Sequence, residues 1–109
     1  MPKTSASEYL ISILDLDKKA LKLEMERMDV HKAGISIMLP KAQFRTIKIK
    51  NVSVTKANII KQDMLSFGGE VATAKGTINH SIKHTDVLIF GTIHQIKNLV
   101  SKLPTMKVG

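Results

Sequence analysis

Three carboxylates, Asp63, Glu70 and Asp86, are the residues of this sequence best suited to acid–base chemistry. General acid and base catalysis needs such groups within hydrogen-bond reach of one substrate. Nothing in their spacing brings these three residues together, and each suits a surface or capping position. The sequence therefore predicts no catalytic residue.

Four histidines are the candidate metal ligands. His80 and His84 are four residues apart, whereas His31 and His94 lie elsewhere. Such a pair can bind zinc when it lies on a helix and a third ligand is present. The surrounding segment, NHSIKHT, is typical of a loop or a strand, and the chain has no HExxH motif and no cysteine. We expect no metal site and no cofactor.

One segment, FGTIHQ, combines the end of an expected strand, a glycine and an expected helix N-terminus. The free backbone N–H groups of a helix N-terminus can bind an anion, which makes Gly91, Thr92 and His94 candidate ligand-binding residues. The segment matches neither GxGxxG nor the P-loop pattern. In the plainer interpretation glycine permits a tight turn, and Thr92 and Gln95 form a capping box.

A second candidate surface lies on the expected helix after Thr55. Its polar residues Asn58, Lys61 and Gln62 are candidates for contacts with a partner. Lys61 could also join Lys56 and Lys75 in a basic face. Solvation of an exposed helix face is the plainer interpretation of these lysines.

The net charge is +8, which is a property of many proteins that bind nucleic acids or anionic membranes. The lysines are spread along the whole chain, however, and only Arg27 and Arg45 are arginines. Aromatic residues make up 4%. Because phosphate and base recognition relies on arginine and on aromatic stacking, nucleic-acid binding is the less favoured alternative.

The size of the chain, 109 residues, predicts one domain spanning residues 1–109. Hydrophobic residues make up 43%, so the chain can form an aliphatic core. It has no apolar run near the ~20 residues of a membrane helix and no apolar stretch typical of a signal peptide. We expect a soluble cytoplasmic protein with no membrane partner.

The first half of the chain has the pattern of a strand, a helix and another strand. Glu8–Leu14 predicts a buried strand, and Leu16–Met28 predicts a helix that packs on a sheet, capped by Asp15 or Asp17 and followed by a stop at Gly34. The short run Ile35–Leu39 fits either a strand or a tight connection. Gln43–Lys50 alternates like a half-buried strand, with a bulge or strand end near Asn51.

The second half carries stronger signals. Thr55 is a candidate N-cap for a helix whose apolar stripe would be formed by Ala57, Ile60, Met64 and Phe67. Gly68-Gly69 ends this helix, Glu70–Ala74 predicts a strand, and Lys75-Gly76 predicts a turn. Thr77–Thr85 fits a hairpin strand or a loop. Asp86–Gly91 predicts a central buried strand, and a last helix ends before Pro104, with a frayed tail beyond it.

These elements together predict an α/β or α+β fold. We expect a mixed sheet of about 4–5 strands packed with three helices in a single small domain.

Two long segments resemble a known family. They are ANIIKQDMLSFGGEVATAKG (Ala57–Gly76) and TDVLIFGTIHQIKNLVSKL (Thr85–Leu103), and they are similar to the N-terminal extension that precedes the barrel of long-form dihydropteroate synthases. The first half of the chain is similar to that extension only in its pattern of elements. The resemblance implies a non-catalytic accessory module in folate biosynthesis.

The partner implied by the resemblance is a barrel subunit of such a synthase, and self-association is the alternative. The catalytic motifs of the barrel are missing, and 109 residues are too few for a (β/α)₈ barrel of ~250. We therefore expect no enzymatic activity of the chain on its own. Two further alternatives stay open, a small basic RNA-binding domain and a binder of a small anion or pterin-type ligand.

Overall fold

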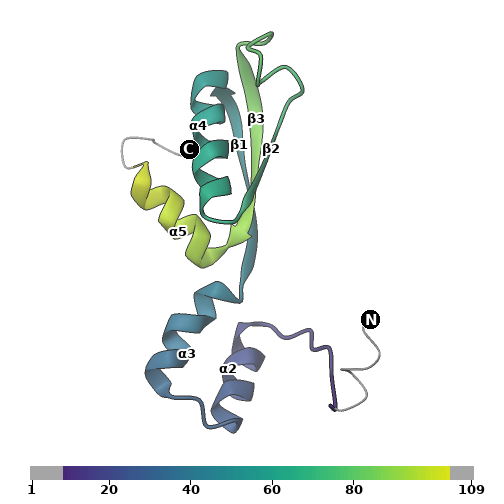
Figure 1. Cartoon of the computed structure of the whole chain (residues 1–109), viewed down its shortest axis with the longest axis vertical. Helices are drawn as coiled ribbons and strands as arrows, with labels where there is room; N and C mark the ends of the chain where they lie inside the picture. Colours follow the sequence, from purple (N-terminus) through teal and green to yellow (C-terminus); the bar gives the residue numbers. More distant parts are fainter. Residues whose placement is uncertain (1–8, 104–109) are drawn as a thin grey trace.

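The computed structural model describes residues 9–103 and shows a small mixed α/β fold (Figure 1). The described part contains four α-helices, one 3₁₀ helix and one three-stranded antiparallel sheet. In chain order the elements are α2 (Lys18–Arg27), α3 (Lys32–Met38), η1 (Leu39–Lys41), β1 (Phe44–Ser53), α4 (Val54–Ser66), β2 (Glu70–Thr73), β3 (His84–Thr92) and α5 (Ile93–Lys102). The α/β class is confirmed, with fewer strands and more helices than the sequence predicts.

The sheet has the strand order β1-β3-β2. Both outer strands run antiparallel to β3, so β1 and β2 are parallel to each other and α4 crosses between them. The predicted central position of β3 is confirmed by the strand order, but the prediction that this strand is buried on both faces is wrong, because buried and less buried residues alternate along it. The segment Thr77–Lys83, which the sequence left open, is a loop that leads into β3.

One face of the sheet carries the main core. Val71, Val87 and Ile89 project from β2 and β3 against Ala57, Ile60 and Met64 of α4 and Leu99 of α5. The predicted stripe of α4 is confirmed, with Phe67 partly buried at its end. The N-cap is Ser53 rather than Thr55, since the Ser53 hydroxyl accepts the Lys56 N–H at 3.4 Å. Helix α4 ends at Ser66, and the chain turns away at Gly68, whose φ of +89° is one that glycine adopts without strain.

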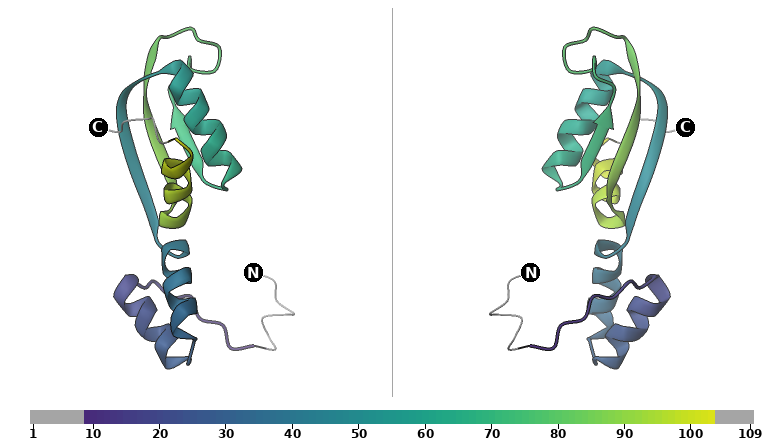
Figure 2. Two further views of the ribbon diagram at one scale, coloured as in Figure 1. Left: turned by 90° about the vertical axis from the view of Figure 1, so that its left-hand side faces the viewer. Right: turned by 90° about the vertical axis from the view of Figure 1, so that its right-hand side faces the viewer.

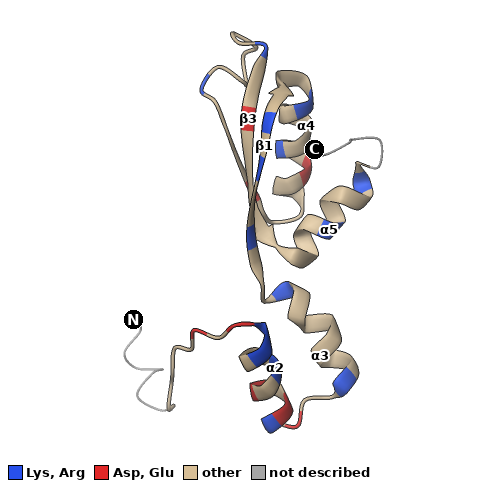
Figure 3. Cartoon of the chain, turned by 180° about the vertical axis from the view of Figure 1, so that it is seen from behind, with Lys and Arg blue, Asp and Glu red and all other residues tan. Residues whose placement is uncertain are grey.

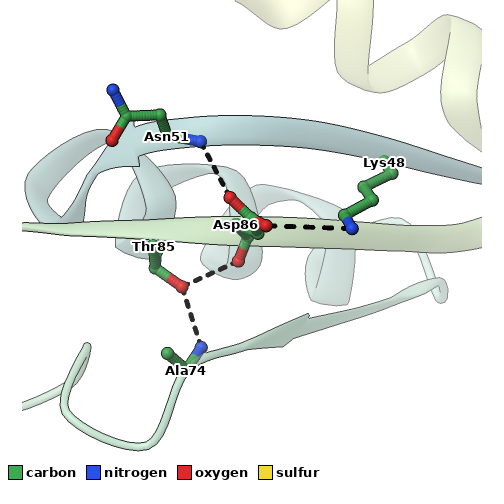
Figure 4. A network of polar contacts seen from close by, with 5 residues as sticks. All are labelled: Lys48, Asn51, Ala74, Thr85 and Asp86. Carbon is green, nitrogen blue, oxygen red and sulfur yellow. Dashed lines mark hydrogen bonds and ion pairs between the residues drawn. The ribbon is translucent and has the colours of Figure 1, made fainter.

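The predicted bulge near Asn51 is confirmed. The register of β1 against β3 shifts between Ile49 and Val52, and Asn51 has a positive φ of 56°. Asp86 of β3 holds this irregular position, because its Oδ1 accepts the Asn51 N–H at 3.0 Å (Figure 4). Its Oδ2 lies 3.8 Å from the Lys48 ammonium.

Helices α2 and α3 form a separate layer of their own. Met25, Ile35 and Leu39 make a small second core with Leu21 and Val30. Asp17 caps α2 as predicted, accepting the Ala20 N–H at 2.8 Å. The prediction that this helix packs on the sheet is wrong, because Leu21 and Met25 pack against α3 and η1. The other large residues of the predicted stripe, Leu16, Leu23 and Met28, are exposed. Figures 1 and 2 show the pair beyond one end of the sheet, connected to it through η1 and β1.

The extra helix replaces the predicted strand or connection at Ile35–Leu39. The His31 ring accepts the Ala33 N–H at 3.2 Å, and Ile35 and Leu39 then fall one turn apart on the same face toward Met25. Gly34 lies inside α3 rather than ending a helix. A five-residue apolar run fits either a strand or a helix, and here the contact with α2 favours the helix.

The strand predicted at Glu8–Leu14 is wrong for the residues that the structure describes. Tyr9–Leu14 contains no helix or strand and pairs with no strand of residues 9–103, and Glu8 lies outside the described residues. An apolar, β-branched run has the composition of a strand, but a strand also needs a neighbouring edge for its backbone groups. Pro104 and the tail predicted to fray also lie outside the described residues.

Candidate functional site

The predicted anion-binding residues lie where β3 meets α5. Three backbone donors at this helix N-terminus, those of Thr92, Ile93 and Gln95, are already engaged by the protein itself. Gln95 N–H donates to the Thr92 hydroxyl at 3.1 Å, Thr92 N–H donates to the Gln95 side chain at 2.9 Å, and Ile93 N–H donates to the Gln43 carbonyl at 2.9 Å. These bonds confirm the capping box.

Gly91 serves packing at this junction. A side chain there would meet the Met64 methyl group and, at 2.9 Å, the Gln95 side-chain oxygen. His94 is exposed on α5, with its Nε2 3.4 Å from the Asn98 amide nitrogen. Binding of a small anion by Gly91, Thr92 and His94 stays a prediction, and it would need donors other than those of Ile93 and Gln95.

The predicted interaction residues of α4 differ in environment. Asn58 is half-buried and donates from its amide to the Thr77 carbonyl at 3.1 Å, which ties the β2–β3 loop to the helix. Lys61 is half-buried and Gln62 is exposed. A structural contact accounts for Asn58, while a role of Lys61 and Gln62 in partner binding stays a prediction.

The three carboxylates each have a structural contact. Asp63 of α4 lies 3.2 Å from the Lys102 ammonium of α5, and Glu70 accepts the neighbouring Val71 N–H at 2.8 Å. Asp86 holds the bulge. The arrangement offers three separate contacts rather than an acid–base pair.

The histidines do not assemble a metal site among residues 9 to 103. His80 lies in a turn with φ +59°, and His84 begins β3. No group of three His, Asp or Glu side chains in the described part of the chain is close enough to hold a metal ion.

Basic side chains are distributed over several elements. Figure 3 shows lysine and arginine on α2, β1, α4 and α5, interspersed with acidic residues. On β1, Lys48 is paired with Asp86. This mixed pattern differs from the single basic face on which a nucleic-acid backbone would lie.

The sheet has one face without a helix, which we call the open sheet face. Helices α4 and α5 both lie on the opposite side (Figure 2). The register places Phe44, Thr46 and Lys48 of β1 opposite Thr92, Phe90 and Leu88 of β3. Phe44 is 63% exposed, and Leu88 and Phe90 are half-buried. Phe44, Leu88, Phe90 and Ala72 form an apolar strip on this face.

A second apolar surface is the groove between β1 and α5, which we call the β1 groove. It has a volume of about 70 Å³. Its lining is entirely aliphatic and comprises Ile47, Ile49, Ile60, Ile89, Ile96, Leu99, Val100 and Leu103. It is a shallow hydrophobic depression beside the outer edge of the sheet.

The third apolar surface is Tyr9–Leu14, which we call the arm. All of its residues are exposed, and five of the six are large and apolar. Sequence reasoning identified the arm as a strand and so expected it to be buried. Neither the open sheet face nor the β1 groove was predicted, although the alternation of Thr46, Lys48 and Lys50 already indicated a solvent-facing side of β1.

Comparisons of the chain with protein-family models, with curated proteins and with solved structures find no match. Within the span from Tyr9 to Leu103, none of the helices has the length and apolar character required to cross a lipid bilayer.

Proposed function

We propose that the protein is a non-catalytic interaction module that acts by binding another protein. The observation that carries this proposal is the amount of apolar surface on the described residues. Fifteen large hydrophobic side chains are exposed, in the arm, on α2 and α3, on β1 and elsewhere. Extended apolar surface of this kind is typical of protein interaction sites.

The open sheet face is the contact surface that we propose. Phe44 lies at its edge, and aromatic residues are among those most enriched in protein interfaces. This face carries charges of both signs, since Lys48 is paired with Asp86 and Glu70 lies on β2 opposite Phe90. An apolar face with charges of both signs favours a protein over a polyanion as the partner.

The partner that we propose is a barrel subunit of a dihydropteroate synthase. Support comes from the resemblance of Ala57–Gly76 and Thr85–Leu103 to the extension that precedes this barrel. The role would then belong to folate biosynthesis, and the absence of cysteine from the sequence agrees with a cytoplasmic location.

The test is co-purification of the full chain with the synthase barrel from the same genome, followed by titration calorimetry. We expect a complex that Phe44→Ser weakens by about tenfold or more. The matched control is Ile78→Ser, because Ile78 is a similarly exposed apolar residue in the β2–β3 loop, 73% exposed. No complex, or an equal effect of both variants, would contradict the proposal.

A further inference from the structure

We propose that the arm forms a fourth strand on the outer edge of β1 in a second copy of this chain, so that two copies associate by exchanging arms. This inference rests on the arm and the β1 groove, whereas the proposed function rests on the open sheet face. The two surfaces meet at Phe44, and separate variants test them, so each proposal can fail without the other.

The arm has the features of a strand that lacks its sheet. Residues Leu10 to Leu14 belong to no helix or strand, Tyr9 lies in a bend, and Ile13 is 87% exposed. Figures 1 and 2 show this segment running outward from α2 with no other element beside it. Successive residues of a strand point to opposite faces, so Ile11 and Ile13 share one side and Leu10 and Leu14 the other.

The edge of β1 has the features of a sheet that lacks a strand. Among the described residues β1 pairs only with β3, which leaves the backbone groups along its outer side free for another strand. The register is regular from Phe44 to Ile49, up to the bulge. This regular stretch has the same length as the arm, six residues, so one arm can cover it.

The β1 groove lies where alternate side chains of an added strand would point. Ile47 and Ile49 face the helix-covered side of the sheet, and with Ile96 and Val100 of α5 they line the groove. Val100 is 58% exposed there. Ile11 and Ile13 of an added arm would enter this aliphatic depression, while Leu10 and Leu14 would extend the strip at Phe44.

Charge complementarity favours a second copy of this chain as the occupant. Asp15 and Asp17 follow the arm directly, and β1 carries Arg45, Lys48 and Lys50. Asp17 already caps α2 and Lys48 is already paired with Asp86, so the complementarity that remains is between Asp15 and Arg45 or Lys50. A strand that brings Asp15 beside β1 offsets cations that otherwise protect an exposed edge from pairing. Because one chain carries both arm and edge, two copies can exchange them about a twofold axis.

The first test measures the mass of the full chain by light scattering over a concentration series. We expect a dimer, at twice 12.1 kDa, that dissociates on dilution. Ile11→Lys combined with Ile13→Lys should raise the dissociation constant by about tenfold or more, since two ammonium groups would enter an aliphatic groove. Both isoleucines are exposed within one chain, so the fold of the monomer should survive. The matched control, Ile78→Lys, should dimerise like the unchanged chain.

The second test distinguishes exchange between copies from an arm that folds back on its own chain. The sequence has no cysteine, so two single-cysteine chains can be mixed, one with Ser12→Cys and the other, of different tag length, with Thr46→Cys or Lys48→Cys. A disulfide between the two chains requires an arm on the β1 of another copy. Ile78→Cys replaces the β1 cysteine as the control.

Three results would overturn the proposal. They are a monomer at every concentration, a dimer that the double arm variant leaves intact, and mixed disulfides no more frequent with β1 cysteines than with the Ile78→Cys control. Loss of barrel binding in Phe44→Ser with intact dimerisation would support the proposed function and would leave the exchange of arms untouched.

Discussion

Glycine is required by close packing at one position of this chain, Gly69, and is replaceable at another, Gly34. A side chain at Gly69 would meet the Met64 methyl group and the Phe90 carbonyl oxygen, the latter at 2.9 Å, and a backbone oxygen cannot rotate away. At Gly34, inside α3, the nearest atoms to an added Cβ are 3.6 Å away. The same substitution should therefore have opposite signs at the two positions.

We predict that Gly69→Ala lowers the free energy of unfolding by about 1–3 kcal/mol, because the β2 strand must move away from β3. Gly34→Ala should raise it by roughly 0.5–1 kcal/mol, because alanine restricts the unfolded chain more than glycine does and suits a helix. Urea denaturation of both variants measures the difference. Equal changes in the free energy of unfolding for the two variants would mean that the backbone around Gly69 shifts at little cost in free energy.

Two buried threonines, Thr77 and Thr85, allow a second comparison because their hydroxyl groups differ in hydrogen bonding. The Thr77 hydroxyl is fully buried and has no hydrogen-bond partner in the structure. The Thr85 hydroxyl accepts the Ala74 N–H at 2.9 Å and donates to the Asp86 carbonyl at 2.7 Å (Figure 4). A buried hydroxyl is unfavourable when it is unpaired and favourable when it is bonded.

We expect Thr77→Val to raise the free energy of unfolding by about 1 kcal/mol and Thr85→Val to lower it by about 1–3 kcal/mol. Thermal denaturation followed by circular dichroism gives both values. A destabilised Thr77→Val variant would show that the Thr77 hydroxyl gains a partner, such as a buried water, in solution.

At the scale of elements, the two small cores predict two levels of stability. Met25, Ile35 and Leu39 make up the buried part of the helical layer, whereas the sheet core contains seven buried residues. Local unfolding free energies follow the amount of buried apolar contact, so α2 and α3 should open more readily than β3.

Amide hydrogen exchange tests this expectation with Ile35→Ala, a residue that is 5% exposed. We predict faster exchange across α2 and α3 with unchanged protection in β3. Ile37→Ala is the control in the same helix, since Ile37 is 61% exposed, and it should leave both regions unaffected. Equal loss of protection in β3 would instead indicate a single cooperative unit.

The elements of the second half were predictable because their local signals agree with their packing. The stripe of α4, its glycine stop, β2, the buried β3 and the Thr92–Gln95 capping box each have a residue-level cause that the structure keeps. The first half was less predictable, since apolar spacing predicts a buried face but does not indicate the element against which that face packs. Only Leu21 and Met25 of the α2 stripe pack against α3 and η1, and the arm has no partner within the described chain.

The candidate site was predictable only in part. The sequence identified the turn at Gly91 and the cap at Thr92, but it could not show that the Gln43 carbonyl accepts the Ile93 N–H from another part of the chain. The alternation of Thr46, Lys48 and Lys50 indicated the solvent-facing side of β1, but the open side of β3 was missed, because the apolar run from Val87 to Phe90 predicts a strand buried on both faces.

At the scale of the whole molecule, arm exchange would link folding stability to protein concentration. Association of folded chains stabilises them by mass action, so the midpoint of thermal unfolding should rise with concentration. The double variant Ile11→Lys and Ile13→Lys should unfold at a midpoint that does not depend on concentration. Scanning calorimetry of both proteins over a wide concentration range measures this dependence, and a constant midpoint for the unchanged chain would contradict it.

Of the three strands in the described residues, the central strand is the last one that the ribosome makes. Phe44 of β1 pairs with Thr92 of β3, 92 − 44 = 48 residues later, and β2 has no neighbour in the sheet until β3 arrives. Pairings this distant in sequence form slowly. Nascent chains that lack β3 therefore contain two unpaired strands, and α4 has no sheet to pack against. Such chains are substrates for chaperones and for proteolysis.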